Sequence, residues 1–211
     1  MGRVCLCLVS ICFLLVSVSY GQSFYGTNDP EVFKAGRDAE FKDKAKSPLK
    51  PGDFENFVGL SYFAYDKKYE INADYAESAD DRYFLMPTSS GTAKRFRKTG
   101  TASFQFDGKS FVLEVYQSEL IDTDPELKKE YGHAYFVPFT DDTNGATTYK
   151  GGRYLSVPKP EAGKLVVNFN LAYNPSCAYG SDRYSCPIPP KSNDLKFPVE
   201  AGEKAYKSTE R

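Results

Sequence analysis

Apolar and polar residues alternate along much of this sequence, and short turn signals interrupt the alternation at regular intervals. Alternation with a period of two is typical of strands that bury one face, whereas a helix repeats every 3.6 residues. The clearest case lies at 102–115, where alternating apolar residues flank Asp107-Gly108, a pair suited to the positive backbone dihedrals of a tight hairpin turn. Strands joined by short turns pair antiparallel. The pattern therefore predicts a mainly antiparallel β fold, a single barrel or sandwich.

This pattern predicts about nine strands. They are expected at 57–64, 69–73, 83–86, 94–99, 102–106, 111–115, 133–139, 153–157 and 165–170. A flanking helix is expected before them at 31–46, because Asp29 supplies a capping carboxylate and Pro30 suits the first helical position. A second, short helix is expected to open at Asp124-Pro125.

The first 21 residues are typical of a secretory signal peptide. A positive charge precedes the apolar run 4–16, and Ser19 and Gly21 are small residues at the spacing that signal peptidase accepts. The run is shorter than the roughly 20 residues that a membrane-spanning helix needs. We expect 1–21 to be a signal peptide, 22–211 to form a single β-rich domain, and the mature protein to be periplasmic or secreted without a transmembrane anchor.

Removal of this leader leaves two of the five cysteines, Cys177 and Cys186. An even pair in an oxidising compartment favours a disulfide, and closing a loop of about 10 residues would stabilise the fold by roughly 2–3 kcal/mol. Free thiols and a reactive pair are the alternatives, although redox pairs usually have two intervening residues. The only histidine, His133, cannot complete a four-ligand zinc site with two thiolates. We therefore expect no metal and no cofactor.

Charge and motifs exclude several classes of function. The 27 Lys and Arg balance 28 Asp and Glu, which argues against a dedicated nucleic-acid or anionic-membrane binder. The sequence has neither a Gly-rich phosphate loop nor a Gly-x-Ser-x-Gly turn. The basic run 94–98 is most simply an exposed strand, but Arg95 and Arg97 share one face of it and would bind an anion if that face lined a cavity.

The most distinctive motif is Asn-Pro-x-Cys-Ala-Tyr at 174–179, followed by Cys-Pro-x-Pro-Pro-x-x-Asn at 186–193. The sequence strongly resembles the domain-of-unknown-function family numbered sixteen eighty-four, found in bacteria and archaea. The resemblance rests on this motif, on residues 57–63 and on Ala-Gly-Glu at 201–203. The resemblance covers nearly the whole mature chain and implies a shared fold without an established activity. The family usually has Asp-Phe-Asn where this chain has Asn-Phe-Asn at 168–170.

Prolines interrupt any regular element in the last forty residues. Such a segment must be held by packing, side-chain hydrogen bonds and the expected disulfide. In a structural interpretation, Asn170, Asn174 and Asn193 satisfy backbone groups of this irregular coil. In a functional interpretation, polar and aromatic side chains converge on a pocket at one barrel end. These candidate ligand-binding residues are Asp141, Arg153, Tyr154, Asn170, Asn174 and Tyr179.

Each of these residue types has a role in such a pocket. Arg153 would pair with a carboxylate or phosphate in a bidentate fork, and Tyr154 and Tyr179 would supply aromatic walls. The leading hypothesis is an exported, non-catalytic protein that binds a small polar or anionic ligand. The alternatives are a metal-independent, hydrolase-like enzyme that uses Asp141, Arg153 and a tyrosine, and a structural envelope protein.

Overall fold

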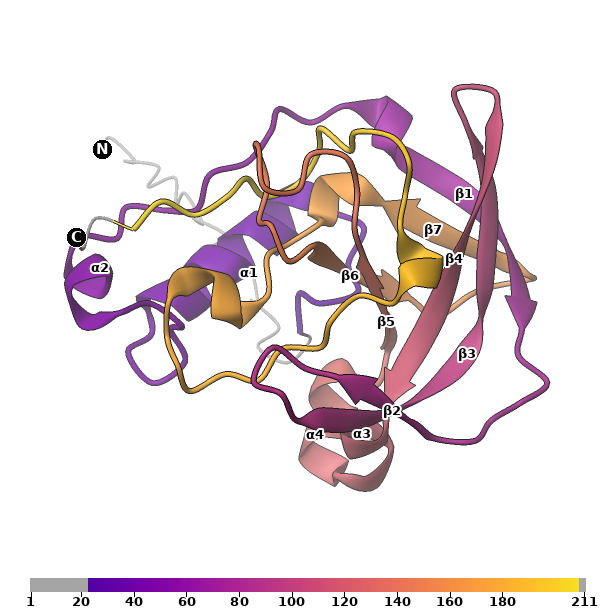
Figure 1. The fold of residues 1–211 in the computed structure, drawn as a ribbon, viewed down its shortest axis with the longest axis horizontal. Coiled ribbons are helices and arrows are strands. Elements are labelled where there is room, and N and C mark those ends of the chain that lie inside the picture. Colours follow the sequence, from indigo (N-terminus) through magenta and orange to yellow (C-terminus); the bar gives the residue numbers. More distant parts are fainter. Residues whose placement is uncertain (1–22, 209–211) are drawn as a thin grey trace, which may run out of the picture.

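The computed structural model describes residues 23–208, so the expected signal peptide at 1–21 lies outside the described residues. The strands are β1 Glu70–Glu77, β2 Phe84–Pro87, β3 Ala93–Phe106, β4 Lys109–Ser118, β5 Ala134–Phe139, β6 Arg153–Pro158 and β7 Lys164–Asn168. They form one sheet in the order β6-β5-β4-β3-β1-β7, and β2 pairs with β3 outside this path. All these pairings are antiparallel, and β6 contacts β7. The sheet is a nearly closed barrel (Figure 1), which confirms the predicted fold class.

The β3–β4 hairpin confirms the strongest turn signal in the sequence. Phe106 pairs with Lys109, so Asp107 and Gly108 form the two-residue connection. Asp107 has φ 47° and Gly108 has φ 74°, and glycine reaches such positive values without steric cost.

The α-helices are α1 Pro30–Lys42, α2 Pro51–Glu55, α3 Glu119–Thr123 and α4 Pro125–Tyr131, and short 3₁₀ helices are η1 Lys67–Tyr69, η2 Phe169–Leu171, η3 Ser176–Tyr179 and η4 Lys191–Asn193. Two of the helices, α1 and α4, were predicted from their capping residues, whereas α2, α3 and the 3₁₀ helices were not. The Asp29 carboxylate accepts the first free amides of α1, and Asp124 does the same for α4. α1 ends before Lys46, because Asp43 is extended and its carboxylate accepts the amide of Ala45. No helix within 23–208 has the length and apolar character to cross a bilayer.

Within the described part of the chain, seven strands form instead of about nine, for two reasons. The expected strands 94–99 and 102–106 are one continuous strand, β3, with a bulge at Lys98–Gly100. A Cβ at Gly100 would lie 2.4 Å from the Ala76 carbonyl oxygen, so glycine permits this close approach. The alternating segment 57–64 is extended but pairs only through an isolated bridge at Tyr62, and Val58 is 94% exposed.

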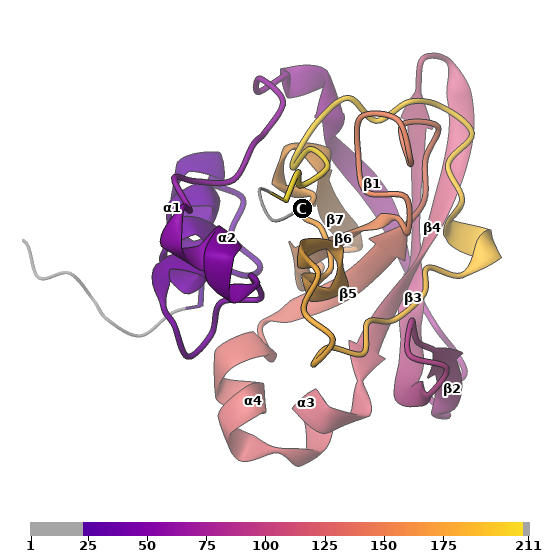
Figure 2. The same ribbon diagram turned by 60° about the vertical axis from the view of Figure 1, so that its left-hand side comes forward.

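The barrel interior holds the main hydrophobic core. Its buried side chains come from every long strand and from Phe33 of α1. α1 and α2 lie on the side of the barrel away from the β3–β4 hairpin (Figure 2). Phe41 of α1 forms a second, smaller cluster with Leu49 and Tyr179.

The irregular segment after β7 is part of this core. It contributes Phe169, Leu171, Ala172, Leu195, Val199 and Ala201. The side chains of three buried asparagines in this segment bond backbone groups, two of them outside the segment and one within it. Asn170 exchanges two hydrogen bonds with the Asp66 backbone, Asn174 donates to the Lys204 carbonyl, and Asn193 bonds the Glu114 backbone and the Pro138 carbonyl. Each bond satisfies a backbone group of the surrounding chain.

Candidate ligand-binding cavity

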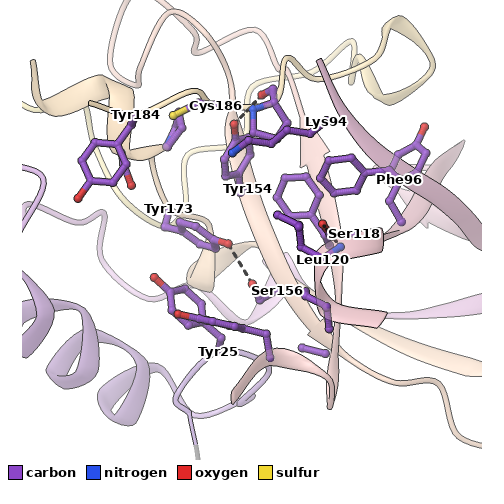
Figure 3. A pocket seen from close by; sticks show the side chains of 18 of the residues that line it. Tyr25, Lys94, Phe96, Ser118, Leu120, Tyr154, Ser156, Tyr173, Tyr184 and Cys186 are labelled. Carbon is purple, nitrogen blue, oxygen red and sulfur yellow. Dashed lines mark hydrogen bonds between the residues drawn. The ribbon is translucent and has the colours of Figure 1, made fainter. Parts of the chain in front are cut away.

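A cavity of about 510 Å³ lies between one end of the sheet, α4 and the irregular C-terminal segment (Figure 3). Strands β3 to β6 supply one wall, and the disulfide-bonded loop 175–187 supplies another. Cys177 and Cys186 are joined as expected, with Cα atoms 6.2 Å apart. Seven tyrosines line the space, which lies within the size range of small-molecule sites.

The charged side chains that line the cavity are all positive. Lys94, Arg37 and Arg183 line it, and no Asp or Glu of the described residues does. Arg183 is exposed and donates to the Ser47 carbonyl and to the Tyr184 hydroxyl. Arg37 is buried and bonds Tyr25, Tyr179 and the carboxylates of Glu40 and Glu203.

Lys94 differs from Arg37, which pairs with two carboxylates, and from the exposed Arg183, which bonds a carbonyl and a hydroxyl, because it is partly buried and its ammonium has no hydrogen bond or ion pair among residues 23–208. Its ammonium makes no ion pair within the described part of the chain. Burial lowers the pKa of Lys94, and no neighbouring carboxylate opposes that shift. Figure 3 shows the side chain extending from β3 toward Tyr154. An anion in the cavity would therefore meet a partly desolvated, unpaired ammonium.

The position of Lys94 follows from strand alternation. Lys94 and Phe96 lie on the face of β3 that lines the cavity. Arg95 and Arg97 point elsewhere and pair with Glu119 and Asp122 of α3 at 3.1 and 3.0 Å. The basic run thus contributes to the cavity through the face opposite to the one that the sequence analysis considered. Period-two alternation was the available signal, because apolar Phe96 marks the inward face.

Two of the six predicted site residues, Tyr154 and Asn174, line the cavity. Arg153 and Asp141 lie outside its lining and face the interior of the fold. The Arg153 side chain is fully buried and donates to Asp141 at 2.9 Å and to the carbonyls of Val199, Ala201 and Glu203. Asp141 also accepts amides of Thr143 and Val199. This pair anchors the C-terminal segment to β6.

Asn170 and Tyr179 also lie outside the cavity lining. Asn170 bonds the backbone before η1, as described above. The Tyr179 hydroxyl donates to Glu203 and accepts from Arg37. The six residues therefore do not converge on one pocket, because Arg153 and Tyr154 are neighbours on a strand and their side chains point to opposite faces.

Glu203 is the most unusual ionisable group beside the cavity, and the sequence analysis did not select it. Its carboxylate is buried, accepts from the amide and side chain of Asn174 and from Tyr179, and forms an ion pair with Arg37 at 3.6 Å. Burial raises its pKa despite the Arg37 guanidinium. Gly202 precedes it with φ 74°, and a Cβ there would lie 2.6 Å from the Ala172 carbonyl oxygen. The Ala-Gly-Glu motif thus needs glycine for this close approach.

A second cavity of about 560 Å³ lies on the other side of Glu203. The Asn174–Glu203 hydrogen bond, at 2.9 Å, links the two linings, since Asn174 lines the first cavity and Glu203 the second. Within residues 23–208 no cluster of three or more His, Cys, Asp or Glu side chains is arranged to hold a metal ion.

Comparisons with known proteins agree with this fold. Residues 55–204 match the family described as "Protein of unknown function (DUF1684)". A solved structure, the solution NMR structure of an uncharacterised protein of Haloarcula marismortui, is 32% identical with a TM-score of 0.65. That match covers 86% of this chain and 94% of the other. No curated protein matches the sequence.

Proposed function

We propose that this chain, which belongs to the DUF1684 family of proteins of unknown function, is an exported protein that binds a small anionic ligand. The family match confirms the resemblance seen in the sequence. The ligand occupies the 510 Å³ cavity with its anionic group at Lys94. It is bound without covalent change. The single observation that carries this proposal is the Lys94 ammonium, which has no ion pair among residues 23–208 and lies in a cavity that none of their carboxylates lines.

The energetic argument concerns the free protein. A partly buried ammonium loses hydration, and a native fold usually compensates by placing a carboxylate beside it. Lys94 has no such compensation among the described residues. A bound anion would provide it and would raise the pKa of Lys94 again. Binding is therefore coupled to proton retention, and affinity should fall as the pH rises through the lowered pKa of Lys94.

Export is supported by the leader-like residues 1–21 and by the Cys177–Cys186 disulfide, since disulfides persist in oxidising compartments. The mature N-terminus, determined by mass spectrometry, is expected at Gln22. A protein recovered with Met1 or Gly2 at its N-terminus would contradict export.

The enzyme alternative is less well supported. Its best acid or base is Glu203, whose raised pKa suits proton transfer. However, three hydrogen-bond donors and the Arg37 guanidinium already occupy the Glu203 carboxylate, and it does not line the cavity that contains Lys94. Non-catalytic binding remains the simpler proposal.

Thermal shift tests the proposal directly. Small carboxylates and phosphate are compared with uncharged amides of the same shape. A ligand at a hundredfold excess over its dissociation constant stabilises the folded form by about 2.7 kcal/mol, which raises Tm by roughly 5–11 °C in a domain of this size. Lys94→Met should abolish the shift. The matched control Lys109→Met, at an exposed position outside the cavity, should retain it. A panel in which no anion raises Tm, or in which Lys94→Met responds like wild type, refutes the proposal.

A further inference from the structure

We infer that the ligand is a planar aromatic anion, a class defined by the rings that line the cavity. This inference rests on the proposed function and adds the nature of the ligand's uncharged part. Six aromatic side chains from different parts of the chain form a continuous series along the cavity wall. In order they are Phe96, Phe136, Tyr154, Tyr173, Tyr25 and Tyr131.

Each ring contacts the next. The centroids of Phe96 and Phe136 are 5.6 Å apart, and those of Phe136 and Tyr154 are 4.8 Å apart. Tyr154 and Tyr173 follow at 5.8 Å, and Tyr25 lies 5.5 Å from both Tyr173 and Tyr131. These spacings lie within the range in which aromatic rings attract each other through their quadrupoles. A ligand in this cavity is therefore bounded by ring faces and edges.

The hydroxyl groups of three tyrosines in this series, Tyr154, Tyr173 and Tyr25, are already bonded to the protein. Tyr154 donates to the Pro187 carbonyl at 2.5 Å, and Tyr173 is 3.0 Å from Ser156 Oγ. Tyr25 donates to Glu40 at 2.9 Å, and its backbone carbonyl accepts from His133. Because these bonds hold the three tyrosines in place, this part of the wall is preorganised and presents π surface. The buried polar atoms of the lining that have no partner, Arg37 Nε, Gln117 Oε1 and Asn174 Oδ1, lie on other residues.

Ring orientation favours a flat ligand over a flexible chain. Tyr154 stands nearly perpendicular to Phe136 and to Tyr173, with interplanar angles of 74° and 87°. A planar ring placed in such a corner stacks on one neighbour while it meets the edge of the other, and both arrangements are favourable between aromatic groups. A saturated body of equal size gains the burial but not the quadrupole term.

The charge lies at one end of the ring series. Lys94 is two residues from Phe96 on the same strand face, and Figure 3 shows both on the side of the cavity opposite Tyr25. Tyr154 and Tyr173 lie between them. The ligand is therefore oriented with its anionic group at Lys94 and its aromatic body along Tyr154 and Tyr173.

Three probes separate the contributions of charge and ring in calorimetric titrations. They are 2-naphthoate, its saturated analogue decahydronaphthalene-2-carboxylate, and the uncharged 2-naphthylmethanol. We expect 2-naphthoate to bind at least about tenfold more tightly than either of the others. Phe136→Leu should reduce the preference for 2-naphthoate over the saturated acid. The control Phe84→Leu, which changes a ring outside the cavity lining, should preserve it.

The outcomes distinguish the two proposals. Equal dissociation constants for the two acids in the wild-type protein overturn the aromatic class and leave anion binding intact. Equal affinity for 2-naphthoate and 2-naphthylmethanol overturns the role of charge, and binding of neither acid overturns the proposed function itself. The comparison of the two acids needs only the wild-type protein, so it stands even if Phe136→Leu does not fold.

Discussion

Replacing Arg153 by methionine tests whether this residue is structural. The Arg153 guanidinium bonds the carbonyls of Val199, Ala201 and Glu203 and pairs with Asp141, with no solvent exposure. Methionine fills similar space but donates nothing. Arg153→Met therefore leaves three backbone carbonyls without this donor and a buried carboxylate without its cation.

The size of the effect follows from these contacts. Removing one partner of a buried ion pair destabilises a protein by about 3–5 kcal/mol. Asp141 retains its bonds from Thr143 and Val199, so part of its charge stays compensated. We expect Arg153→Met to lower the free energy of unfolding by about 3–5 kcal/mol, or Tm by roughly 6–20 °C for a domain of this size.

Urea unfolding followed by circular dichroism measures this change. The matched control is Arg95→Met, which removes an exposed pair with Glu119 and should change stability by less than about 1 kcal/mol. Asp141→Asn should destabilise the Arg153→Met protein less than it destabilises wild type, because the unpaired charge is then removed. If Arg153→Met is no more destabilising than Arg95→Met, the buried pair does not hold the C-terminal segment and the argument fails. Arg153→Lys, a milder change, serves if the methionine variant does not fold.

Four further outcomes are expected in the same assays. Replacing Cys177 and Cys186 by serine should lower the free energy of unfolding by about 2–3 kcal/mol, and the oxidised protein should show no alkylatable thiol before reduction. Asn193→Ala should lower it by about 2–4 kcal/mol, because three backbone groups lose a buried partner. Because the pKa of Glu203 is raised in the folded state, the folded protein binds the Glu203 proton more tightly than the unfolded chain does. The free energy of unfolding of the wild type should therefore decline as the pH rises above 4.5, and Glu203→Gln should lack the part of this decline that Glu203 causes. Lys94→Met should raise stability by about 0.5–1 kcal/mol in the absence of ligand; a decrease would contradict the uncompensated charge.

Local signals predicted the regular elements well. The Asp107-Gly108 turn, the Asp29 cap of α1 and the Asp124 cap of α4 are each set by a few adjacent residues. Alternation failed at 57–64, where the chain is extended without a pairing partner along most of its length. Whether an alternating segment becomes a strand depends on a neighbour that local patterning does not specify.

The candidate site was predicted only in part. Tyr154 and Asn174 line the cavity, whereas Arg153 and Asp141 bond to each other and to backbone carbonyls. The sequence showed Lys94 as part of a basic run, but it did not show that no carboxylate of the described residues pairs with the Lys94 ammonium. An isolated charge is a property of everything packed around it, and no local pattern reports that.

The sequence alone determined the antiparallel β class, the β3–β4 turn, the starts of α1 and α4 and the family, because each depends on residues close together in the chain or on a contiguous motif. The tertiary structure decided which charges are neutralised and which rings meet. Tyr25, Lys94, Phe136, Tyr154 and Tyr173 come from five separate segments, and barrel closure brings them to one cavity. Contacts between such distant residues arise from packing, so the side chains proposed to bind the ligand were assembled by the fold.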